Sequence, residues 1–335
     1  MNTSKMRFLP PCCILALAST AWPLAEPHGT MLRYPDVSED RIVFSYANDL
    51  WTVPREGGLA QTLSSPPGTE TMPRFSPDGS QIAVGGCNEI TIWESATGES
   101  VRRIGGMPQR IQDLIWKENL MIVGGGTPGE YGEVLVVDSM GQSNTKSLTT
   151  FSDIVLAIDL DSTGARVAAC SANRSTKLLQ VENAELLWEK SFHSSWVTGI
   201  AFSADDQFIV TTSLDETCKV LNAKTSELFT IFNGHRQQLG DFPGRFKVND
   251  VTLNSKSKLF VTGGEGKSLC VWDPVKAKLE NGTAADMEDR FYKKAHTKYI
   301  VHGFQQPVHR IVATTEYIVA AGAEGTVKVF DAEQL

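Results

Sequence analysis

Seven times along this chain, a short segment rich in β-forming residues ends in an apolar or aromatic anchor residue. The intervals between successive anchors are 40, 44, 42, 42, 51 and 58 residues. A period in the low forties, with four short strands per unit, is typical of β-propeller blades. We therefore predict an all-β, seven-bladed β-propeller of four-stranded antiparallel blades over residues 31–335. The anchors are Val53, Trp93, Val137, Leu179, Leu221, Trp272 and Phe330.

Composition indicates a folded, turn-rich protein and argues against nucleic acid as a partner. Hydrophobic residues make up 41% of the 335 residues, with 28 Gly and 15 Pro, which argues against disorder. The formal net charge is −8, whereas a sequence-independent grip on nucleic acid relies on clustered Lys and Arg. We expect one propeller domain and no nucleic-acid partner.

Residues 1–30 differ from the rest and have the layout of a secretory signal peptide. Basic residues precede the apolar run Phe8–Trp22, and small residues favour cleavage after Ala21 or Ala25. The run is short for a membrane span, so we expect no stable membrane insertion after processing. The sequence predicts a secreted or periplasmic protein; the alternative is a cytoplasmic protein with an unprocessed N-terminus.

The cysteines give no sign of disulfides or metal binding. Equivalent strands of different blades lie too far apart for a disulfide, and no CxxC or Cys/His spacing suggests zinc. We expect four buried free thiols and no bound metal. The four cysteines after residue 30 are Cys87, Cys170, Cys218 and Cys270.

The first repeat resembles one known group of propellers. The pattern LRYPDVS…DRIVF…DLWTVP…GG, followed by PRFSPDG, is similar to the propeller repeats of tricorn-type proteases over about residues 31–85. In that family the protease activity resides in other domains. The resemblance therefore implies a regulatory or substrate-gating propeller that acts with a separately encoded hydrolase, and we keep this as the alternative function.

Later repeats resemble the WD-repeat family. The segment HSSWVTGIAFSADDQFIVTTSLDETCKVLN, at 193–222, has a His-led start, an AFSADD turn and a Ser-Leu-Asp loop, and weaker matches extend over most of 70–335. The resemblance implies a buried hydrogen-bond network of His193, Ser213 and Asp215, with Leu221 at the family's Trp position. We expect only the fifth blade to keep this network.

Two insertions and one missing strand interrupt the repeat. Residues 236–246 lie between blades five and six, and residues 274–296 interrupt blade six after its third strand, with a candidate short helix at 284–292. The chain ends too soon after Phe330 to give blade seven a fourth strand. Residues 22–30 are the candidate replacement. Without them, the ring must close by apolar packing of Ile42 and Phe44 of blade one against Ile318, Val327 and Val329 of blade seven.

No catalytic constellation is present. A nucleophile elbow, a P-loop, an HExxH helix and a dinucleotide fingerprint are all absent at the required spacing. The Gly-rich run 124–129 precedes a strand and no helix, so it fits a blade hairpin better than a phosphate site. Aspartates such as Asp36, Asp78 and Asp205 stand at expected turn positions. We therefore expect no enzyme activity and no cofactor, although an enzyme that uses the central channel is a third hypothesis.

The positive evidence favours surface recognition. Aromatic and Arg side chains are the usual anchors of protein interfaces, and several stand where the chain passes from one blade into the next. We expect a monomeric scaffold that binds a protein or peptide on that face. The alternatives are that Trp196 packs between blades and that the others are solvated loop residues. The candidate binding residues are Trp196, Arg110, Phe242, Arg245 and Gln306.

Overall fold

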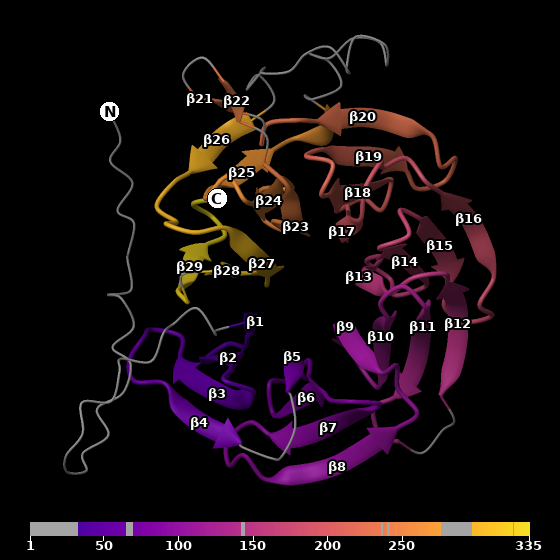
Figure 1. Ribbon diagram of the computed structural model, residues 1–335. Coiled ribbons are helices and arrows are strands. Elements are labelled where there is room, and N and C mark those ends of the chain that lie inside the picture. The colour runs from indigo at the N-terminus through magenta and orange to yellow at the C-terminus, as the bar shows by residue number, and fades with distance from the viewer. Residues whose placement is uncertain are drawn as a thin grey trace.

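The protein is a ring of seven β-sheets around a central channel (Figure 1). The computed structural model describes residues 33–64, 70–141, 145–235, 237–239, 242–244, 246–275, 297–323 and 325–335. Each sheet runs from an inner strand at the channel to an outer strand at the rim, with neighbouring strands antiparallel. The predicted seven-bladed all-β propeller is confirmed, and all seven anchors lie on the third strand of a blade.

The strands fall into four equivalent sets. The inner strands are β1 (Arg33–Val37), β5 (Thr71–Phe75), β9 (Arg110–Lys117), β13 (Val155–Leu160), β17 (Val197–Phe202), β23 (Val248–Leu253) and β27 (Val308–Ala313). The second strands are β2 (Arg41–Tyr46), β6 (Gln81–Gly85), β10 (Leu120–Thr127), β14 (Arg166–Ser171), β18 (Phe208–Ser213), β24 (Phe260–Gly264) and β28 (Tyr317–Gly322). The third strands are β3 (Asp49–Pro54), β7 (Glu89–Glu94), β11 (Tyr131–Asp138), β15 (Thr176–Gln180), β19 (Cys218–Asn222), β25 (Leu269–Trp272) and β29 (Val327–Asp331). The outer strands are β4 (Gln61–Ser64), β8 (Ser100–Gly105), β12 (Lys146–Phe151), β16 (Leu186–Lys190), β20 (Leu228–Phe232) and β26 (Thr297–Val301).

The two faces of the ring carry different loops. We call the face at which each inner strand begins the top face, and the face at which it ends the bottom face. Because neighbouring strands are antiparallel, the turns between second and third strands also lie on the top face. Turns between inner and second strands lie on the bottom face. One is Pro77-Asp78-Gly79, where Gly79 has a φ of 73° and its N–H donates to Ser76 O at 2.8 Å.

Apolar packing between blades holds the ring together. Among the described residues, seven hydrophobic clusters form, one between each pair of neighbouring blades. Burial of this apolar surface is the dominant stabilising contribution in such a fold. The Gly-rich run forms the β10–β11 hairpin, in which Gly126 pairs with Gly132.

The ring closes by apolar contacts between blades one and seven. Inner strand β1 contacts both β27 and β28. Ile42 and Phe44 pack with Val319, Val327 and Val329 in one cluster. Ile318, also expected at this junction, packs instead against blade six. The candidate closing segment 22–30 lies outside the described residues.

The insertions fall where the repeat is interrupted. A short hairpin of β21 (Gln237–Leu239) and β22 (Phe242–Gly244) lies between blades five and six. Strand β26 pairs with β25 and completes blade six after the second insertion. The candidate helix at 284–292 lies outside the described residues.

One expectation about the cysteines is wrong. Cys170, Cys218 and Cys270 are buried free thiols, but Cys87 is exposed. Cys87 lies in the turn between β6 and β7, where Gly86 N–H donates to Glu89 O, so its side chain faces solvent on the top face. In the described part of the chain, no helix is long and apolar enough to cross a membrane.

Candidate functional site

Blade five is fixed by a buried hydrogen-bond network at its top end. His193 Nδ1 lies 2.8 Å from Asp215 Oδ2, and His193 Nε2 lies 2.9 Å from Thr211 Oγ1. Asp215 also accepts bonds from the Ser194 N–H at 3.1 Å and the Thr217 hydroxyl at 2.6 Å. These bonds tie the loop that enters blade five to its second strand and to the turn between its second and third strands.

The network differs from the expected one at the second strand. Thr211, and not Ser213, contacts the imidazole, while Ser213 Oγ accepts the Asp215 N–H at 3.0 Å. Residues 211 and 213 lie on the same side of β18 because side chains alternate along a strand. The sequence pattern predicted the correct side of β18, but it placed the contact with the imidazole at residue 213 instead of residue 211.

Both titratable groups of this network have shifted pKa values. Burial lowers the pKa of His193 more than Asp215 raises it, so the imidazole stays neutral near pH 7. Burial alone would raise the pKa of Asp215, but hydrogen bonds from His193, Thr217 and Ser194 outweigh it and hold this pKa well below its usual range. Asp215 is therefore the charged acceptor of the network.

Blade six has a related network that the sequence analysis missed. His235 Nε2 lies 2.8 Å from Thr262 Oγ1, and Trp272 Nε1 donates to the same hydroxyl at 3.2 Å. The dipeptides Gly234-His235 and Trp272-Asp273 were the available signal. The expectation that only blade five keeps such a network is therefore wrong.

Trp196 is exposed on the top face beside this fixed loop. Its side chain is 50% exposed, so it does not pack between blades. Trp196 O accepts the Leu214 N–H at 3.1 Å, and the nearby Ser194 N–H is held by Asp215. A rigid backbone thus presents a large aromatic side chain to solvent.

Blade three contributes two exposed side chains, Arg110 and Tyr131, to the same top face. Arg110, the first residue of β9, is exposed and pairs with Gly126, near the β10–β11 turn. Tyr131, the first residue of β11, is 36% exposed. Tyr131 was not among the predicted binding residues, although its position after the Gly-rich turn was visible in the sequence.

Of the other three predicted binding residues, the structure describes the side chain of Gln306 only. Gln306 is exposed just before β27, also on the top face. The backbone of Phe242 lies in β22, but its side chain lies outside the described part of the molecule. Arg245 lies outside the described residues altogether.

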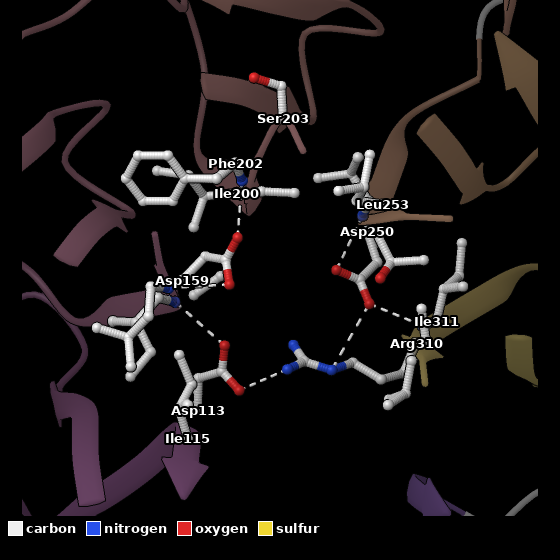
Figure 2. A pocket seen from close by; sticks show the side chains of 18 of the residues that line it. Asp113, Ile115, Asp159, Ile200, Phe202, Ser203, Asp250, Leu253, Arg310 and Ile311 are labelled. Carbon is white, nitrogen blue, oxygen red and sulfur yellow. Dashed lines mark hydrogen bonds and ion pairs between the residues drawn. The ribbon is translucent and has the colours of Figure 1, made fainter. Parts of the chain in front are cut away.

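Charged side chains of the inner strands line the central channel, and Figure 2 shows Asp113, Asp250 and Arg310 among them. We call Asp36, Arg74, Asp113, Asp250 and Arg310 the central polar layer; each lies on the inner strand of its blade. Arg310 of blade seven reaches across the channel to Asp113 of blade three, which also accepts Arg74 Nη2 at 3.2 Å. Asp250 Oδ2 lies 3.6 Å from Arg310 Nε.

The aspartates of this layer also link neighbouring blades. Asp36 accepts the Phe75 N–H at 2.8 Å, Asp113 the Ile158 N–H at 3.1 Å, and Asp250 the Ile311 N–H at 2.7 Å. Each bond runs from one inner strand to the inner strand of the next blade. Asp36 is therefore a buried strand residue and not the turn residue expected from the sequence.

Burial raises several pKa values around the channel. It raises the pKa of Asp250 to about 6, although Arg310 opposes the shift. For Arg310, burial lowers the pKa, but Asp113 and Asp250 raise it more, so the guanidinium stays charged. In the described ranges, no group of three His, Cys, Asp or Glu side chains is arranged to hold a metal ion.

Comparison with known proteins identifies the repeats. The WD40 family, described as WD domain, G-beta repeat, matches residues 185–222 and 227–273, which include blade five's second and third strands and most of blade six. These two matches contain both Thr-centred contacts on the second strands, Thr211 and Thr262.

Curated relatives are similar over parts of their length. Nuclear distribution protein PAC1 of Komagataella phaffii is 21% identical over 54% of this chain and 41% of its own. WD repeat-containing protein 1 of Gallus gallus is 22% identical over 60% of this chain and 32% of its own. Eukaryotic translation initiation factor 3 subunit I of Neurospora crassa is 23% identical over 72% and 70%. The chain thus spans less than half the length of the first two relatives.

A solved structure has the same fold. A chain in the crystal structure of the mitotic checkpoint complex superimposes with a TM-score of 0.70 at 14% identity, covering 90% of this chain and 91% of that one. The likeness shows that the two chains share the propeller fold. The chain is a seven-bladed β-propeller that contains WD40 repeats at residues 185–222 and 227–273.

Proposed function

We propose that this chain is a non-enzymatic propeller that binds a protein or peptide on its top face, with Trp196 as the main anchor. The observation that carries the proposal is the exposed Trp196 on a loop fixed by the His193–Asp215 network. A large aromatic side chain on a preorganised backbone loses little conformational entropy on binding.

Other features of the top face support a protein partner. Tyr131 and Arg110 are exposed together at blade three, and Gln306 is exposed at blade seven. Tyr, Trp and Arg are the residue types most enriched at interface hot spots. The similar chain in the mitotic checkpoint complex belongs, by the name of that structure, to an assembly of proteins.

Quantitative affinity capture from the native host tests the proposal. Wild-type protein should recover at least one partner, and Trp196→Ala should reduce that recovery roughly 30-fold, the effect of losing a hot-spot residue. Met140→Ala is the matched control, since Met140 is 51% exposed but lies in a turn between third and outer strands, on the bottom face. Equal recovery with Trp196→Ala would refute the proposal. A hydrolase as the recovered partner would favour the alternative function.

We also propose that the protein acts outside the cytoplasm. The support is the arrangement of residues 1–30, where basic residues precede the apolar run Phe8–Trp22 and small residues stand at Ala21 and Ala25. The intact mass of protein purified from the native host should correspond to a chain that begins after one of these two residues. An unprocessed chain beginning at Met1 in the cytoplasm would contradict this.

A further inference from the structure

A cavity of about 380 Å³ occupies the bottom half of the central channel. Four residues of the central polar layer line it: Arg74, Asp113, Asp250 and Arg310. The turn residues Ser162 and Ala204 line its mouth and are exposed, so the cavity opens on the bottom face. Its volume is within the range of small-molecule sites in proteins. The cavity is therefore separate from the top face that carries Trp196.

The charges that line the cavity do not balance. Four aspartates, Asp113, Asp159, Asp206 and Asp250, line it together with only two arginines, Arg74 and Arg310. Both arginines are already engaged by Asp113, and Arg310 Nε lies near Asp250. A cavity lined by an excess of one sign concentrates ligands of the opposite sign.

Asp159 is a lining carboxylate without an ion pair to a described lysine or arginine, and it lies deeper in the cavity than Asp206, whose side chain accepts the Ser162 hydroxyl and N–H at the mouth. Asp159 lies at the wall of the cavity, and its oxygens accept the Phe202 N–H at 2.7 Å and the Leu160 N–H at 2.9 Å (Figure 2). Within the described residues, no lysine or arginine forms an ion pair with it. Burial, together with the nearby Asp113 and Asp206, raises its pKa to about 7. A carboxylate with one donor on each oxygen keeps lone pairs for a further donor.

An apolar wall lies between this carboxylate and the mouth. We call Ile115, Leu160, Leu253, Val312 and Ala313 the aliphatic collar; all five line the cavity and are half-buried. Inner strands run from the top face to the bottom face. In each contributing blade, the collar residue follows the charged residue on the same inner strand, so the collar lies closer to the bottom face. Such a site matches a ligand with an aliphatic stem and a cationic head.

We propose that this cavity binds an aliphatic ammonium group, with the ammonium at Asp159 and its methylene stem against the aliphatic collar. The ammonium supplies the donor and the positive charge that Asp159 lacks. A metal ion fits less well because the described carboxylates do not converge on one point. The same chemistry is carried by a lysine side chain of a partner and by a free alkylamine.

Isothermal titration calorimetry with three probes tests the proposal. The probes are a capped Gly-Gly-Lys-Gly-Gly peptide, the same peptide with acetyl-lysine, and n-butylamine. The lysine peptide should bind at least about 10-fold more tightly than the acetylated one, because acetylation removes the charge. Binding of butylamine with similar affinity would identify a free amine as sufficient, whereas binding of the peptide alone would assign the site to a partner's lysine.

Variants locate the site. Asp159→Asn should weaken binding of the lysine peptide about 10-fold or more. Asp78→Asn is the matched control, because Asp78 is an exposed aspartate in a turn on the same face and does not line the cavity. Val312→Lys places an ammonium inside the collar and should abolish binding. Because Val312 is only half-buried, this variant should still fold.

The binding results of the three variants support the proposal or overturn it. Loss of binding in Asp159→Asn and Val312→Lys, but not in Asp78→Asn, supports the proposal. If thermal melting shows that Asp159→Asn does not fold, the Val312→Lys result decides. Equal binding of the acetylated peptide, no saturable binding of either amine at about 1 mM, or retained binding in Val312→Lys would overturn it.

Discussion

Blades five and one have the same four-stranded sheet but very different interiors. In blade five, His193, Asp215 and Thr211 satisfy one another at hydrogen-bond distance. In blade one, Ser45 Oγ and Trp51 Nε1 are buried and have no hydrogen-bond partner among the residues that the structure describes. A polar network is therefore not required to form a blade.

What the two blades share is apolar packing against their neighbours. Val43 and Leu50 of blade one pack against blade two, much as Val210 and Val220 of blade five pack against blade six. The comparison indicates that burial forms the blade, while the network fixes a loop at one end of it. Four substitutions test this division, from the largest expected effect to the smallest.

The largest effect is expected from Trp272→Ala in blade six. Trp272 is fully buried, stacks on Phe232 with ring centroids 4.3 Å apart, and donates to Thr262. Truncation should lower the free energy of unfolding by about 3–5 kcal/mol, measured by urea denaturation. The matched change in blade one is Trp51→Ala. Trp51 is half-buried and its indole N–H finds no partner in the described part of the chain, so the loss of stability should be clearly smaller.

Asp215→Ala should have the next largest effect. It leaves His193, which is 5% exposed, with an unpartnered ring nitrogen and frees the Ser194 N–H. We expect a loss of about 2–3 kcal/mol in the free energy of unfolding. Because the loop also holds Trp196, hydrogen exchange at residues 194–196 should become faster. Unchanged exchange there would show that packing alone fixes the loop.

Glu70 gives a smaller, pH-dependent effect at the junction of blades one and two. Its carboxylate is buried, and burial together with Asp49 outweighs a hydrogen bond from the Leu50 backbone and raises the pKa of Glu70 to about 8. Because this folded pKa exceeds the ordinary 4.5, the folded state holds the proton more tightly, and stability is lost as pH rises from about 4.5 through 8. Glu70→Gln should therefore gain stability relative to wild type over this range, by about 1–2 kcal/mol at its upper end.

Denaturation curves between pH 5 and pH 9, roughly the range over which such a carboxyl titrates, measure this difference. Glu39→Gln is the control, since Glu39 is exposed in blade one. A difference between Glu70→Gln and wild type that does not grow with pH would contradict the assignment.

Much of the fold was predictable from sequence because it depends on periodic apolar residues. The anchors from Val53 to Phe330 all lie on third strands, since each repeat places its buried residue at the same point of the sheet. The polar sites were less accessible. Asp113, Asp250 and Arg310 become one cluster only when inner strands far apart in sequence are aligned in register around the channel.

The state of Trp196 could not be decided from sequence either. An aromatic residue at the start of an inner strand can face a neighbouring blade or solvent, and only the position of the next blade decides which. His235 was different. Its Gly-His dipeptide and the later Trp272 are signals that the sequence itself carries, because both side chains meet at Thr262 within one blade.

The smallest effect is expected from Ser45→Ala in blade one. Ser45 is 5% exposed, and its hydroxyl has no partner among the described residues. Removing a buried hydroxyl that makes no hydrogen bond costs no interaction and relieves its desolvation, so stability should stay within about 0.5 kcal/mol of wild type or rise slightly. Thr211→Val in blade five is the contrasting change, because Thr211 is equally buried but bonded to His193, and it should lower the free energy of unfolding by about 1–2 kcal/mol. Equal losses for the two variants, measured by urea denaturation, would mean that blade one has a polar network of its own and that the two interiors differ less than their contacts indicate.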